Sequence, residues 1–164
     1  NILGVTMSGE NQLKASDRLA DHIKSIEEYI NLTNVSYTTF NVEYIVAANL
    51  SKEDMGKMTT QEMFDTAYLL YGYSTYIQDE INKNKVALNW CEDQIEKLVA
   101  ANLNNFDQYT KHDVKRQIII KENSYAASVD SMRAVAEARL QCLEGKVYEL
   151  KRQGDILLER GKRL

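Results

Sequence analysis

The sequence predicts an all-α protein, a long antiparallel helical hairpin of the coiled-coil type preceded by short N-terminal helices. Two observations lead to this prediction. The 164 residues include no proline, the residue that most often interrupts helices. Apolar residues also recur at every third or fourth position along two long stretches, and a short polar segment near residue 105 separates them. Hydrophobic residues make up 44% and charged residues 27%, which is ordinary for a soluble globular protein.

The first 58 residues are expected to form an N-terminal arm with short helices. Residues 1–14 have no sustained periodicity and are predicted to be extended. A short amphipathic helix is expected after Ser16, a suitable N-cap, because apolar residues then follow at helical spacing. Residues 32–40 are β-branched and turn-forming and predict a linker, followed by a second short helix over 42–49. The apolar positions of the first helix are Leu19, Ile23, Ile26 and Ile30.

The hairpin itself is expected over residues 59–164, and its first helix begins at a capping box, Thr59-x-x-Glu62. Nothing interrupts this helix before Asn104-Asn105, so about 45 residues at ~1.5 Å each would form a rod of roughly 65 to 70 Å. Its apolar stripe has heptad spacing, which favours a seam for another subunit or a protein partner. The residues assigned to this seam are Leu70, Ile77, Ile81, Asn84, Leu88 and Ile95, with Asn84 as the polar position that selects register or partner.

A second long helix is predicted after a variant capping box at Thr110-x-x-Asp113, and it runs on through Leu157. Glycines near its C-terminal end are expected to cause fraying. The short connection forces antiparallel arms, so residues whose numbers sum to roughly 215 should face each other. Cys91 would then lie near Ser124 and Cys142 near Tyr73, too far apart for a disulfide. The glycines are Gly145, Gly154 and Gly161.

Catalytic, metal-binding and membrane-spanning roles find little support in the sequence. It contains no phosphate-binding loop, no metalloprotease or hydrolase motif, and no Cys or His spacing typical of a metal site. We therefore expect no enzyme activity, no metal and no cofactor. No apolar run approaches the ~20 residues that cross a bilayer, so no membrane partner is expected. The net charge of −4 requires any nucleic-acid binding to use local basic patches.

A basic cluster follows the predicted turn, and further lysines lie in the first long helix beside an aromatic stretch. Cations grouped in this way can bind phosphates, and aromatic side chains can stack on the bases of single strands. The ordinary alternatives are solubility for the cations and helix packing for the aromatic residues. The candidate nucleic-acid-binding residues are Lys83, Lys85, Lys111, Lys115, Arg116 and Lys121, and the aromatic residues are Tyr68, Tyr71, Tyr73, Tyr76 and Trp90.

Two short stretches within residues 64–164 resemble the UvsY family of phage recombination mediators. The first is Lys85-Val-Ala-Leu88, and the second is Asp107-Gln-Tyr-Thr-Lys-His-Asp-Val-Lys115, which is similar to the family's pattern around its turn. The chain departs from the family directly after the first stretch, where Asn89-Trp90-Cys91-Glu92 replaces the basic residues of the DNA-binding motif. Residues 1–58 have no counterpart in the family.

The resemblance implies a homo-oligomer that binds single-stranded DNA in the cytoplasm of a phage host. It also implies contacts with a RecA-type recombinase and a single-strand-binding protein. The alternative is a non-enzymatic structural or assembly protein, such as a virion or scaffold component, in which the hairpin makes only protein contacts. The acidic net charge of −4 favours this alternative slightly.

Overall fold

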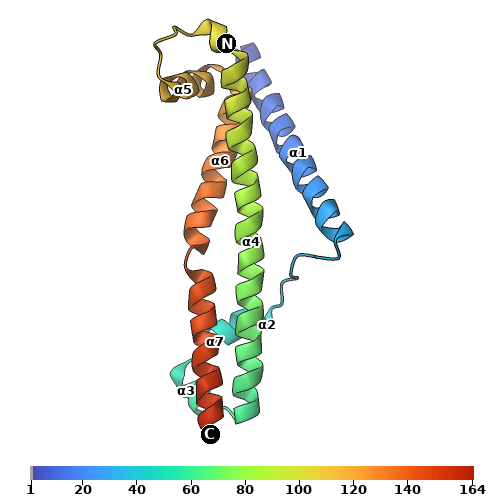
Figure 1. Ribbon diagram of the computed structural model, residues 1–164, viewed down its shortest axis with the longest axis vertical. Helices are drawn as coiled ribbons and strands as arrows, with labels where there is room; N and C mark the ends of the chain where they lie inside the picture. Colours follow the sequence, from blue (N-terminus) through green and yellow to red (C-terminus); the bar gives the residue numbers. More distant parts are fainter. Residues whose placement is uncertain (1) are drawn as a thin grey trace. The chain divides into compact units, whose positions relative to one another are not determined.

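A computed structural model describes the backbone of residues 2–164 and the side chains of residues 14–164. Within this part of the chain every regular element is a helix (Figure 1). The longest helix, α4, packs against the helices that follow it, which confirms the predicted all-α hairpin. The elements are α1 (Ile2–Leu32), α2 (Glu43–Ala48), α3 (Lys52–Gly56), α4 (Thr60–Ala101), the 3-10 turn η1 (Leu103–Asn105), α5 (His112–Glu122), α6 (Ser124–Leu143) and α7 (Lys146–Arg163).

The chain folds into two compact units, and α4 contributes to both. The first unit comprises residues 1–36 and 83–140, and the second comprises residues 37–82 and 141–164. The division expected near residue 58 is therefore not the one observed. Each unit combines a piece of the N-terminal segment with pieces of both hairpin arms.

The core of the first unit is built where α1 and α6 meet the second half of α4. Ala15 of α1, Ile95 of α4 and Val129 of α6 are each 0% exposed and share one cluster. The guanidinium of Arg18 lies 5.5 Å from the centre of the Tyr125 ring and donates a hydrogen bond to its hydroxyl at 3.2 Å. Ala15 lies beside this contact, and its small side chain lets α1 approach α4 and α6 closely. A neighbouring cluster of Val99, Ile119 and Ala126 continues the core towards the turn.

The core of the second unit is built where α2 and α7 meet the first half of α4. Figure 1 shows α2, α3 and α7 beside that part of α4. Glycine allows α7 to come close, because a Cβ built at Gly161 would lie 2.6 Å from the Phe64 ring, and one at Gly154 would lie 3.0 Å from Tyr71. These two glycines are buried, so the fraying expected there is wrong. The buried residues are Ala47, Met63, Ala67, Leu70, Ile77, Leu150 and Leu157.

The N-terminal segment differs from its prediction at the start and agrees with it further on. Helix α1 already begins at Ile2, so residues 2–14 are helical rather than extended, and Ser16 lies inside the helix instead of capping it. The first residue lies outside the described part. Residues 35–41 have no regular structure, as the predicted linker requires, and α2 falls inside 42–49. Helix α3 was not expected, although Ser51 and Asp54 form its capping box.

The first hairpin helix agrees with its prediction at both ends. The Thr59 hydroxyl accepts the backbone N–H of Glu62 at 3.1 Å, and α4 begins at the next residue. The helix ends at Ala101, close to the predicted break.

The second arm is three helices, not the one that was predicted. At the first break the side chain of Asn123 accepts the N–H of Ala126 at 3.0 Å and so caps α6. At the second break Gly145 adopts φ 82°, a left-handed conformation that residues with a Cβ adopt at a cost. Thr110 does not cap the arm, because Lys111 is the residue before α5 and makes no side-chain cap.

The facing rule, that facing residues have numbers summing to about 215, is only approximate in both units: the sum is 212 for Glu96 and Arg116 and 225 for Phe64 and Gly161. Cys142 and Tyr73 line the same cavity, as a sum of 215 requires. Cys91 packs against Val129 rather than Ser124. The break at Asn123 explains the shift at Cys91, because α6 restarts there with its own register along α4. Both cysteines are unpaired, as predicted.

Truncation of Ile95 should show how strongly the first unit depends on its core. Replacement by alanine removes a fully buried side chain, so Ile95→Ala should lower the free energy of unfolding by about 2 to 5 kcal/mol. Urea unfolding followed by circular dichroism measures this change. Tyr68→Ala, at a side chain that is 78% exposed, is the control and should change stability by no more than about 0.5 kcal/mol. Equal losses in the two variants would contradict the assigned core.

Gly145 and Gly56 should respond oppositely to alanine. Gly145→Ala forces a Cβ into the left-handed region and should cost about 1 to 2 kcal/mol of unfolding free energy. Gly56→Ala meets no atom within 4 Å and places a better helix former in α3, so it should gain up to about 1 kcal/mol. The same urea titration compares them. A neutral or stabilising Gly145→Ala would contradict the break between α6 and α7.

Candidate nucleic-acid interface

The turn between α4 and α5 is held by its own polar groups. The Asp107 carboxylate accepts the backbone N–H of Tyr109 at 2.8 Å, and the Asp107 carbonyl accepts the N–H of Thr110 at 3.0 Å. Asn102 closes the end of α4 by donating its side-chain N–H to the Leu98 carbonyl at 2.7 Å. This local network, typical of Asn and Asp turns, leaves the Tyr109 ring 84% exposed. The turn therefore presents an aromatic side chain to solvent.

Arg116 anchors α5 to α4 through charge. Its guanidinium donates to Glu92 at 2.7 Å and also to Glu96, and its side chain is only 20% exposed. His112 lies 3.0 Å from the same Glu96 carboxylate. The hydrogen bond from His112, together with that from Arg116, lowers the pKa of Glu96 below its ordinary value despite some desolvation. The cluster thus holds the first turns of α5 in place.

The six candidate cations do not share one environment. Arg116 is committed to two carboxylates, and Lys83 is half-buried and already has a partner in the chain. Neither side chain is placed to serve as a simple phosphate contact. The prediction that Arg116 binds DNA is therefore corrected, because Arg116 positions α5 instead. The remaining four form no ion pair with any described side chain. They are Lys85, Lys111 and Lys121, which are exposed, and Lys115, which is half-buried.

Helical geometry fixes where these lysines lie on α4 and α5. Glu92 and Glu96 follow Lys85 by seven and eleven residues, close to two and three full turns of α4. Lys85 therefore lies on the side of α4 to which Arg116 binds, about 10 Å along the axis from Glu92. Lys111 directly precedes α5, and Lys115 lies in its first turn, four residues further on. Lys121 is displaced from Lys115 by roughly 120° around that helix.

Tyr71, Tyr73 and Tyr76 of α4 pack against other parts of the chain instead of forming a stacking surface. Tyr73 stacks on Tyr44 with ring centres 5.4 Å apart, and Tyr76 lies 5.3 Å from Phe40. Tyr71 donates its hydroxyl to Asp155, which raises the pKa of the tyrosine to about 12.

The two other aromatic residues of this set behave differently from each other. Trp90 is half-buried and lies 6.5 Å from the His22 ring. Tyr68 alone in the set is largely exposed. The packing interpretation therefore holds for all but Tyr68.

The apolar seam of α4 is covered by the chain's own helices. Leu70, Ile77 and Ile95 are buried in the two cores, and Asn84 is buried with a partner in the chain. Ile81 and Leu88 are half-buried, and Ile81 packs against the core of the second unit. The seam is an intramolecular interface, so its assignment as an oligomer surface is corrected.

Sequence reasoning missed two features of this region. Tyr109 was not singled out, although an aromatic residue between Asp107 and Lys111 in a predicted turn is a signal for an exposed ring. The link of Arg116 to Glu92 and Glu96 was also missed. The facing rule carried that signal, because Glu96 and Arg116 sum to 212, close to 215.

The described residues include no cluster typical of a metal site. No group of three His, Cys, Asp or Glu side chains among them is placed to hold a metal ion. Burial, followed by the neighbouring Glu92 charge, raises the pKa of the Cys91 thiol to about 11 and keeps it protonated at neutral pH. None of the described helices has both the length and the apolar content to span a membrane.

Comparison with known proteins adds no relative to these observations, because no family model, no curated protein and no solved structure matches the chain.

The Glu96 cluster predicts a specific pH dependence of stability. Because the folded-state pKa of Glu96 is lowered, its carboxylate stabilises the fold at neutral pH. That contribution falls as pH drops below the ordinary value of 4.5 and is lost once pH passes through the lowered folded-state pKa. Urea titrations at several pH values should therefore find Glu96→Gln less stable than the parent at pH 7, with a gap that shrinks below pH 4.5. A gap that stays constant with pH would contradict the cluster.

Proposed function

We propose that the chain is a phage recombination mediator that binds single-stranded DNA at the α4–α5 turn and helps to load a RecA-type recombinase. The observation that carries this proposal is the outward Tyr109 ring beside Lys111, with Lys115 one turn further on. All three lie in the stretch Asp107–Lys115 that resembles the mediator family. A ring for stacking beside cations for phosphates is the chemistry that single strands require.

The proposed binding is electrostatic with an aromatic contribution. Lys111 and Lys115 would contact phosphates, while Tyr109 would stack on one base. Lys85 and Lys121 extend the positive charge along α4 and α5. Such a patch binds weakly in one subunit, and a homo-oligomer would multiply it through effective concentration.

Arg116 supports the proposal indirectly. It offsets half of the negative charge of Glu92 and Glu96, two carboxylates that repel phosphates close to Lys115. This role also fits the departure from the family at Asn89–Glu92. In that stretch Cys91 is buried and Glu92 is the partner of Arg116, so packing takes the place of basic residues.

Contacts with the recombinase and with a single-strand-binding protein belong to the proposal through the resemblance alone. Residues 1–58, which the family lacks, are the natural place for a partner specific to this chain. The proposed site of action is the host cytoplasm.

A structural or assembly role, as in a virion, is the second candidate. The observation that favours it is the apolar surface of α2, where Val42 and Val46 are 72% and 66% exposed. Such side chains suit protein contacts better than nucleic acid. This candidate requires no affinity for DNA.

Salt-dependent binding of single strands tests the choice between the two candidates. Fluorescence anisotropy of a labelled oligonucleotide should show binding that weakens with salt and prefers a single strand to a duplex. Lys111→Ala with Lys115→Ala should reduce the log–log salt slope by about 1.4, or about 0.7 for each lost phosphate contact. Lys52→Ala with Lys57→Ala, an equal loss of charge at the two ends of α3, is the matched control and should leave the slope unchanged. No binding at low salt would overturn the mediator proposal in favour of the structural one.

Tyr109→Ala separates stacking from charge. It should weaken the affinity for single strands by about 1 to 3 kcal/mol, while the salt slope stays the same because no cation is lost. Tyr68→Ala removes another exposed ring and serves as the control in the same anisotropy assay. Equal affinities of the Tyr109 variant and the parent chain would exclude Tyr109 from the site.

A further inference from the structure

A groove with an acidic rim lies in the second unit, between α2, α3 and the first turns of α4. It encloses about 390 Å³, and four carboxylates but no cation are among its lining residues. Its floor is apolar and includes Val46, which is 66% exposed. None of the four carboxylates forms an ion pair with a described side chain. The carboxylates are Glu43, Asp54, Glu62 and Asp65, and the floor residues are Val46, Leu50, Met58 and Leu69.

The outer face of α7, in the same unit, has the opposite character. Its inner face is buried through Leu150, Gly154 and Leu157, and the opposite side of the helix is exposed. Ile156 and Leu164 remain 54% and 71% exposed on that outer side. Three arginines accompany them along one shallow depression, and none has an ion-pair partner among the described side chains. The arginines are Arg152, Arg160 and Arg163.

Two carboxylates also belong to this depression. Asp155 accepts the hydroxyl of Tyr71, and Glu159 lies between the arginines in sequence. Arg152 donates to the Tyr148 hydroxyl at 3.2 Å. Helix α7 as a whole has six Lys and Arg residues against three Asp and Glu, a net charge of +3. The face is therefore basic with apolar side chains at helical spacing.

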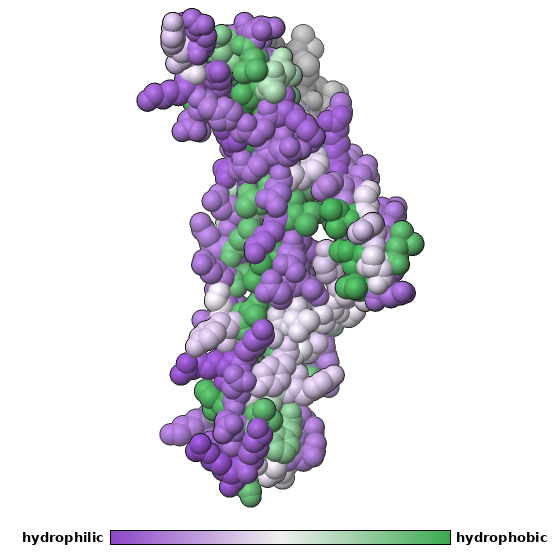
Figure 2. Space-filling view, in the orientation of Figure 1, coloured by the Kyte–Doolittle hydropathy of each residue, from purple (hydrophilic) through white to green (hydrophobic). Residues whose placement is uncertain are grey.

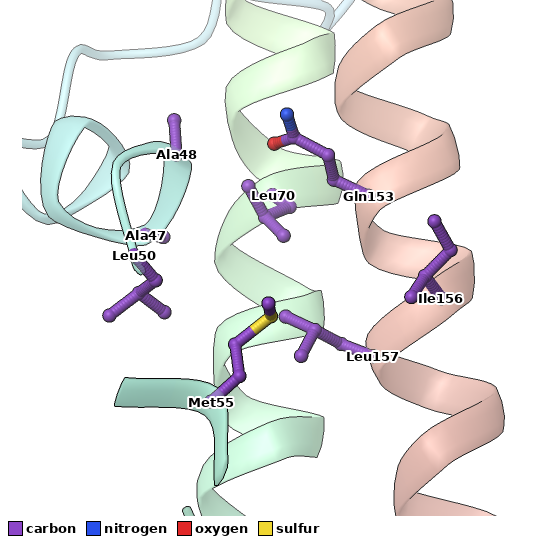
Figure 3. A pocket seen from close by; sticks show the side chains of 8 residues that line it. All are labelled: Ala47, Ala48, Leu50, Met55, Leu70, Gln153, Ile156 and Leu157. Atoms are coloured by element: carbon purple, nitrogen blue, oxygen red, sulfur yellow. The ribbon is translucent and has the colours of Figure 1, made fainter. Parts of the chain in front are cut away.

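The groove and the α7 face are neighbours on one surface. A cavity of 180 Å³ lies between α2, α4 and α7, and Figure 3 shows Ala47 and Leu50 across it from Ile156. Ala47 and Leu50 also line the acidic groove, while Ile156 also lines the basic depression. Figure 2 shows separate apolar patches among hydrophilic ones in the lower part of the view, where α2, α3 and α7 lie.

We infer that a second copy of this chain docks the basic outer face of its α7 in the acidic groove. Adjacent complementary patches on one surface suit a two-fold axis, which pairs each groove with the other copy's α7. Ile156 and Leu164 would cover the apolar floor, and arginine–carboxylate pairs would form the rim. The contact is isologous and buries side chains that a lone copy leaves exposed.

The charge pattern of the groove favours the α7 face of a second copy over nucleic acid and over a neutral helix. Nucleic acid is repelled by a groove whose charged lining residues are all carboxylates, and a neutral apolar helix would leave these four without a cation. The α7 face supplies cations and apolar side chains together, and every copy of the chain carries it. The inference does not depend on DNA binding, because all of its residues lie in the second unit and the proposed DNA site lies in the first.

Charge reversal with mixing tests the contact. Glu62→Lys with Asp65→Lys changes the groove, and Arg160→Glu with Arg163→Glu changes the α7 face. Each variant alone places like charges opposite each other at its altered positions in both contacts, so its dimer dissociation constant should rise at least tenfold in analytical ultracentrifugation. An equimolar mixture restores opposite charges at both contacts and should associate as tightly as the parent chain.

Controls keep the test decisive. Asp17→Lys with Asp21→Lys makes the same charge change on α1 and should leave association unaltered. Circular dichroism checks that each variant folds, and recovery in the mixture excludes misfolding as the cause of a loss. A parent chain that stays monomeric up to about 100 μM would overturn the inference, because a physiological contact needs a dissociation constant below that range. The inference would also be overturned if neither charge reversal changed the dimer dissociation constant, or if the mixture did not restore association.

Discussion

The apolar stripe of α4 has to be covered along 42 residues, and the arrangement of the other helices follows from that need. No single helix covers it. In the first unit Ala15 of α1 and Val129 of α6 close over Ile95, and in the second unit Ala47 of α2 and Leu157 of α7 close over Leu70. Small residues at these contacts permit close approach, so burial is nearly complete. An interface between subunits must then be found elsewhere.

The cluster around Arg116 decides what α5 can present to solvent. Ile119 is the only described residue of α5 that is classed as buried, so apolar packing alone holds this helix weakly. A largely buried guanidinium shared by Glu92 and Glu96 supplies the missing attachment, and ion pairs of this kind contribute more than exposed ones. Once Arg116 faces inward, helical geometry turns its neighbour Lys115 about 100° away from it. Lys111 directly precedes α5, at the end of the turn that exposes Tyr109. A structural ion pair thereby orients the proposed DNA contacts.

Local signals predicted much of this fold, and the failures have definite physical causes. The Thr59 cap, the end of α4 and the antiparallel return all follow from short-range chemistry and loop length. The breaks at Asn123 and Gly145 were missed because the apolar period continues across them, and a glycine costs a helix only about 1 kcal/mol. The spacing of apolar residues carries no information about a positive φ, such as that of Gly145. The role of Arg116 depends on which residues of α4 face it across the hairpin, and composition does not carry that information.

The two proposals place DNA binding on the first unit and self-association on the second. The proposed lysines lie in residues 83–140, and the complementary faces lie in residues 37–82 and 141–164. Self-association would therefore use none of the residues of the proposed DNA site, and a dimer would carry that site twice. With a net charge of −4, one copy attracts DNA poorly at long range, so close local contacts must supply the affinity. Duplication of a weak patch raises that affinity without any new contact.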